Sequence, residues 1–111
     1  AMNDIPQGYV YPNEVHFEIN QNNILEYKLA SDFLNFNRVD VVCVQHEYGI
    51  FGGKNGIYLL ELLRNLRTPV VTTLHTVLEK PTQGQKKVLY ELGHISLVMH
   101  LMNPMDVFEI S

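Results

Sequence analysis

The chain is poor in cysteine, in positive charge and in long apolar runs, and each shortage argues against certain classes of protein. Cys43 is the single cysteine among 111 residues, which excludes an intrachain disulfide and favours a reducing compartment such as the cytoplasm. The formal net charge of -4 argues against general attraction to nucleic acid or to an anionic membrane. No apolar run approaches the roughly 20 residues that span a bilayer. We therefore expect a cytoplasmic protein without a transmembrane segment that does not bind nucleic acid.

The length and the pattern of apolar residues predict one α/β domain or part of one. With 46% hydrophobic residues, the chain can bury a core but is too short for two domains of ordinary size. Strand and helix signals alternate along it, which favours a parallel sheet with right-handed connections. After a loop-like beginning, the predicted strands cover about 15–19, 41–44, 69–76 and 96–102, and the predicted helices about 23–37, 57–66 and 85–95. Asn103 and Pro104 indicate the start of a last helix.

The segment "VDVVCVQ" indicates how the central strand is buried. Its run of β-branched residues from Val41 to Val44 is typical of a parallel strand with both faces covered. Cys43 lies in the middle of this run, so we expect an inert thiol in the core, because burial disfavours the reactive thiolate.

The stretch "QHEYGIFGGKNG", residues 45–56, has the composition of a ligand loop without the spacing of a known one. A phosphate loop needs four residues between its first glycine and Gly-Lys-Ser/Thr. Here three residues separate Gly49 from Gly53, and Asn55 follows Lys54. The dinucleotide pattern G-x-G-x-x-G is absent as well. Two interpretations stay open: a tight turn without a ligand, or a loop whose glycines let the backbone approach a ligand closely.

Two histidines are placed where parallel sheets hold their ligands. His46 and His75 each end a predicted strand, and ligand sites lie at the carboxyl ends of such strands. We therefore expect both segments at one edge of the sheet. Metal binding by His46, Glu47 and His75 lacks the usual spacing of zinc ligands, so no metal site is predicted. A histidine that is merely solvated or hydrogen-bonded at a strand end is the alternative for each.

Two segments in combination resemble a known enzyme family. "DVVCVQHEYGIFGG", followed by "PVVTTLHTVLEKP" and a glutamine-rich helix start, resembles the N-terminal domain of a retaining glycosyltransferase of family 4, the group-1 type with GT-B architecture. The resemblance extends from "YVYPNEVHFEI" to "SLVMH". It implies a Rossmann-like parallel sheet with flanking helices, of which residues 1–111 are an incomplete, acceptor-side part. In that family a second, C-terminal domain binds the nucleotide-sugar donor.

The resemblance also implies roles for individual residues. His75 in "TTLHT" matches the family's Thr-x-His segment, whose histidine faces the donor sugar, so a catalytic role in orienting sugar hydroxyls is implied. The "QHEYG" segment matches the acceptor side of one branch of the family, and the glycines after it bring the loop close to the cleft. The substrate-binding residues implied are His46, Glu47, Tyr48, Gly52, Gly53 and Thr73.

The implied reaction transfers a sugar from a nucleotide-sugar to a hydroxyl acceptor with retention, without a metal or a further cofactor. The family's first strand and glycine-rich loop would precede Ala1, and the donor domain would follow. We therefore expect this piece to be inactive alone and to oligomerise through an uncovered sheet edge. A non-catalytic α/β binding or assembly module is the alternative. A flavodoxin-like or other nucleotide-binding domain is a third possibility.

Overall fold

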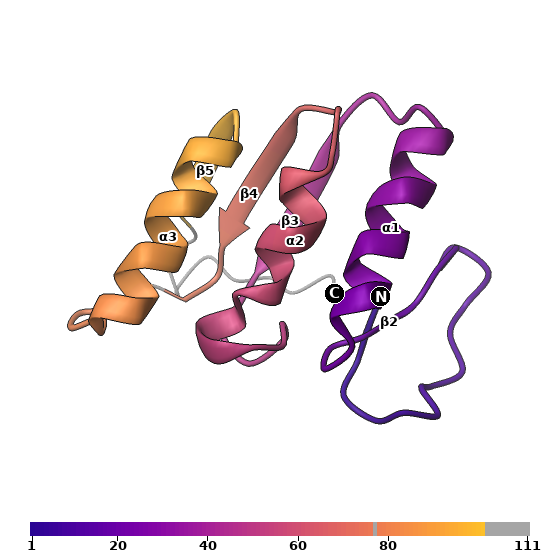
Figure 1. Ribbon diagram of the computed structural model, residues 1–111, viewed down its shortest axis with the longest axis horizontal. Coiled ribbons are helices and arrows are strands. Elements are labelled where there is room, and N and C mark those ends of the chain that lie inside the picture. Colours follow the sequence, from indigo (N-terminus) through magenta and orange to yellow (C-terminus); the bar gives the residue numbers. More distant parts are fainter. Residues whose placement is uncertain (77, 102–111) are drawn as a thin grey trace.

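Two small parallel sheets and three α-helices form an α/β domain in residues 1–76 and 78–101, the part of the chain that the computed structural model describes. The larger sheet has the strand order β3-β4-β5, and β1 pairs with β2 in the smaller one. Figure 1 shows the three helices side by side on one face of the larger sheet. The elements are β1 (Met2–Asn3), β2 (Ile19–Asn20), α1 (Ile24–Phe36), β3 (Val42–His46), a 3-10 turn (Lys54–Gly56), α2 (Tyr58–Arg64), β4 (Val70–Leu74), α3 (Gln83–Ile95) and β5 (Val98–Leu101).

The predicted parallel pairing and alternation are confirmed, with shifts at the element ends. Both β3–β4 and β4–β5 are parallel pairs. The expected strand at 15–19 is reduced to Ile19–Asn20, which pairs with the unexpected strand Met2–Asn3. The helix expected from Asn103 lies outside the described residues.

Helix caps explain where two of the helices begin. Asn23 precedes α1, and its side chain accepts a hydrogen bond from the N–H of Leu25 at 3.1 Å, which satisfies a donor that the helix itself leaves unpaired. α3 begins two residues before the predicted position. Thr82 and Gln85 form a capping box there: the Thr82 hydroxyl accepts from the Gln85 N–H, and the Gln85 side chain accepts from the Thr82 N–H.

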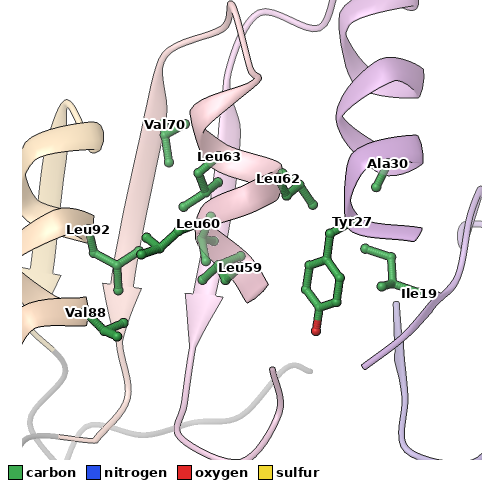
Figure 2. Close-up of a cluster of buried hydrophobic side chains, with 11 residues drawn as sticks. Ile19, Tyr27, Ala30, Leu59, Leu60, Leu62, Leu63, Val70, Val88 and Leu92 are labelled. Atoms are coloured by element: carbon green, nitrogen blue, oxygen red, sulfur yellow. The ribbon is translucent and has the colours of Figure 1, made fainter. Parts of the chain in front are cut away.

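The hydrophobic core is centred on the four leucines of α2. All four are at most 7% exposed. Figure 2 shows them between Val88 and Leu92 of α3 on one side and Tyr27 and Ala30 of α1 on the other. A helix that is apolar on several sides is one that is packed on several sides. The leucines are Leu59, Leu60, Leu62 and Leu63.

The prediction that β3 is buried on both faces is wrong. Val44 and His46 are buried, whereas Cys43 and Gln45 between them are exposed. Successive side chains of a strand point to opposite faces, and in the described residues the helices cover only one face (Figure 1). Cys43 is thus an exposed free thiol and not a core residue. We call the uncovered side of β3, β4 and β5 the open face.

A buried tyrosine joins the glycine loop to the N-terminal segment. The Tyr27 side chain is 0% exposed; its hydroxyl donates to the carbonyl of Gln21 and accepts from the N–H of Gly52, both at 2.9 Å. The two backbones are also in direct contact, because a Cβ on Gly52 would lie 1.7 Å from the Gln21 carbonyl oxygen. Only glycine fits at position 52. The contact buries the Gly52 N–H, and the Tyr27 hydroxyl accepts a hydrogen bond from it.

We predict that Tyr27→Phe lowers the free energy of unfolding by about 1–3 kcal/mol, because the Gly52 N–H then stays buried without an acceptor. Urea unfolding followed by circular dichroism measures this. Tyr90→Phe is the control: Tyr90 is 68% exposed, so its loss of a hydroxyl should change stability by less than about 0.5 kcal/mol. Equal unfolding midpoints for the two variants would show that the Tyr27 bridge does not stabilise the fold.

Candidate functional site

The carboxyl ends of the three parallel strands meet at one edge of the larger sheet. His46 of β3 is in register with Leu74 of β4, and Leu74 is in register with Leu101 of β5. The backbone N–H of His75 donates to the carbonyl of His46 at 2.9 Å. The structure thus brings the "QHEYG" and "TTLHT" segments together, as their positions at strand ends predicted.

His75 lies on the open face and contacts a side chain of the neighbouring strand. Its Nε2 atom is 2.6 Å from Oε1 of Gln45. The His75 side chain is half-buried, its Nδ1 atom is buried, and Gln45 is exposed. Thr73, directly opposite Gln45 in the register, is partly buried on the same face. The arrangement makes a polar surface at the carboxyl end of the sheet.

The side chain of His46 is not where the sequence predicted it. It is 1% exposed and lies on the face that the helices cover, because it shares the alternation of Val44. Its ring stacks on Phe51, with centroids 5.8 Å apart, and meets the ring of Tyr48 edge-on at 5.2 Å. In this arrangement His46 packs the base of the loop, so its side chain does not reach the open face.

Burial decides the ionisation of His46. Loss of hydration, and secondarily the charge of nearby His75, lowers the pKa of His46 below its ordinary value of 6.5. Among the described residues, its Nδ1 atom and the Tyr48 hydroxyl are buried without hydrogen-bond partners. Burial likewise raises the pKa of Tyr48. Both side chains are therefore neutral near pH 7.

Packing and backbone conformation explain why positions 52 and 53 of the loop are glycine. The Gly52 N–H is bonded to Tyr27 and is not available to an anion. Gly53 has a φ of 77° and lies against Tyr58, where an added Cβ would be 2.6 Å from a ring carbon. Glu47, at the start of the loop, is exposed. Packing alone thus accounts for Gly52 and Gly53, which were expected to bring the loop close to a substrate.

Two pockets adjoin this loop. One, of about 310 Å³, lies between Gly49 and Ile50 of the loop and the N-terminal residues Asp4 and Tyr9. The other, of about 330 Å³, is mostly apolar and lies beside β3, between the N-terminal strands and α2. In residues 1–76 and 78–101 no group of His, Cys, Asp and Glu is arranged to hold a metal ion. No helix in the same residues is long and apolar enough to cross a membrane.

Sequence reasoning missed Gln45. No role was predicted for it, although a signal was present: alternation along "VCVQH" puts the side chain of position 45 on the face opposite to that of position 46. Of these two neighbours it is Gln45, and not His46, that shares a face with His75.

Comparisons of the chain with models of protein families, with curated proteins and with solved structures find no match. A functional hypothesis for this chain therefore depends on its own residues and their geometry.

We predict that His46 makes the stability depend on pH. The unfolded state binds a proton near pH 6.5, whereas the folded state, with its lowered pKa, does so only at lower pH. The unfolded state thus binds more protons below pH 6.5, and the free energy of unfolding falls as the pH drops from 6.5 to the folded pKa, by up to about 1.4 kcal/mol per pH unit. Above pH 6.5 the full stability is present.

Urea unfolding at a series of pH values between about 5 and 8 tests this dependence. His46→Leu should flatten the curve below pH 6.5, whatever its effect on absolute stability. His16→Gln is the matched control, since His16 is exposed, and it should leave the shape of the curve unchanged. A His46→Leu curve parallel to that of the wild type would exclude His46 as the source.

Proposed function

We propose that this chain is the acceptor side of a glycosyltransferase, an incomplete Rossmann-like N-terminal domain of a GT-B enzyme. The proposed reaction transfers a sugar from a nucleotide-sugar to a hydroxyl acceptor with retention. The observation that carries the proposal is the meeting of "QHEYG" and "TTLHT", the two segments with family resemblance, at the carboxyl ends of adjacent parallel strands. Ligands of open parallel sheets bind at that edge.

His75 is the residue that we propose for the reacting centre. It is half-buried at the end of β4, and it is held by a backbone bond to His46 and a side-chain contact to Gln45. A positioned imidazole can hydrogen-bond a sugar hydroxyl, and such a bond lowers the barrier if it strengthens in the transition state. A partly exposed ring with a fixed backbone suits this role.

The pocket beside Gly49 and Ile50 is the acceptor site that we propose. Asp4 and Tyr9 line its other side, and the Tyr9 hydroxyl donates to the Asp4 carboxylate. A carboxylate and a phenol hydroxyl can both hydrogen-bond hydroxyl groups, the kind of group that accepts the sugar. Glu47, exposed at the start of the same loop, adds a second carboxylate at this end of the sheet.

A non-catalytic assembly module is the second candidate, and a specific observation favours it. The open face carries exposed apolar side chains: Val41 is 48% exposed and Val98 is 52% exposed. A surface of this kind is typical of a contact with another protein, and the glycine loop needs no ligand to explain its conformation.

We predict that His75→Ala in the complete transferase lowers kcat/KM by a factor of about 10² or more, as expected for a polar group at the reacting centre. Sugar transfer from nucleotide-sugar donors is the measurement, and the 111-residue chain alone should show none. Stability should change by less than about 1 kcal/mol, because His75 is only half-buried at the end of its strand. His16→Ala, at an exposed site, is the control. Unchanged turnover in His75→Ala would exclude His75 from the reacting centre, whereas a complete protein that transfers no sugar would favour the assembly module.

We also propose that the 111-residue chain self-associates. In the described residues β3 and β5 are the outer strands of the sheet, so each has an edge without a partner strand, and such edges pair readily with other chains. We predict a dimer or larger oligomer by light scattering at micromolar to millimolar concentrations. Reducing agent must be present, because Cys43 is exposed and can cross-link copies. A monomeric mass throughout this range would contradict the prediction.

A further inference from the structure

Gln45 and His75 form a contact between the side chains of adjacent strands. The pair follows from the register: Gln45 is level with Thr73, two residues before His75. The backbone bond from the His75 N–H to the His46 carbonyl, at 2.9 Å, fixes the chain immediately beside the pair. The Gln45 side chain then extends along the open face to the imidazole, where the distance from Oε1 to Nε2 is 2.6 Å.

The chemistry of this contact determines where the imidazole carries its proton. An amide oxygen has no hydrogen and can only accept. The 2.6 Å contact is therefore a hydrogen bond only if Nε2 of His75 is the donor. A neutral ring held in this way has its proton on Nε2 and its lone pair on Nδ1, and the tautomer of a histidine is commonly set by such a partner.

We propose that Gln45 is a positioning residue for His75, which it holds in one ring orientation with the proton on Nε2. The proposal rests on the function proposed above, in which His75 contacts the substrate. Gln45 acts through His75, and nothing in its role requires contact with the sugar. At metal sites, removal of a residue that orients a histidine ligand typically changes activity by 10- to 100-fold. For Gln45 we expect an effect at the lower end of that range.

The first test does not depend on enzymatic activity. Two-dimensional 1H–15N spectra of the histidine side chains, recorded at a pH where the rings are neutral and assigned with His75→Gln, show which ring nitrogen is protonated. The wild-type chain should give a His75 proton on Nε2 that is protected from exchange with water. Gln45→Leu should lose this signal, because the acceptor is gone, whereas Gln45→Glu should retain it. Cys43→Ala, on the same strand and face, is the matched control.

The second test measures the consequence in the complete transferase. Gln45→Leu should lower kcat by about 10-fold with little change in KM, because a wrongly oriented ring affects the reacting centre more than ground-state binding. Gln45→Glu should restore most of the rate, and Cys43→Ala should not change it.

The two tests separate this proposal from the proposed function. A wild-type His75 proton on Nδ1, or a protected Nε2 proton that persists in Gln45→Leu, would overturn the positioning role. Full transfer activity in Gln45→Leu, combined with loss of activity in His75→Ala, would also overturn the positioning role. If the complete protein transfers no sugar at all, the proposed function fails, and with it the catalytic consequence. The spectra then still decide whether Gln45 orients His75.

Discussion

Burial of α2 against the sheet and between α1 and α3 is the constraint on which the rest of the structure depends. This helix connects β3 to β4, and its four buried leucines hold it on one face of the sheet. The two strands must then run parallel and end together. Their common end brings the carbonyl of His46 within 2.9 Å of the His75 nitrogen. A candidate site made from distant parts of the sequence is thus a consequence of apolar packing elsewhere.

Alternation along the strands then places the side chains of two similar histidines on opposite faces of the sheet. His46 shares the covered face with Val44, so it loses its hydration, stacks on Phe51 and meets the ring of Tyr48 edge-on. His75 follows the other alternation and meets Gln45 on the open face. His46 is a core residue whose burial lowers its pKa, and His75 stays half-buried at the end of its strand. The covering of one face only, in the described residues, produces the difference.

The glycine-rich loop shows how packing can imitate a ligand motif. Gly52 must be glycine because its backbone touches that of Gln21, and its N–H is satisfied by Tyr27. Neither requirement involves a ligand. In the proposed function, the parts of the loop that face a substrate are its beginning, where Glu47 is exposed, and the pocket beside Gly49 and Ile50.

The sequence by itself determined the three helices and the parallel strands of the larger sheet, because these depend on local patterns, but it did not reveal the strand Met2–Asn3. Apolar periodicity located α1 to within one residue at each end, and the strand ends placed both histidine segments at one edge. Only the tertiary structure decided which face of the strands the helices cover. A run such as "VVCV" looks the same whether one face or two are covered, so Cys43 and His46 were misplaced. The bond between Gln45 and His75, 30 residues apart, required the register that packing sets.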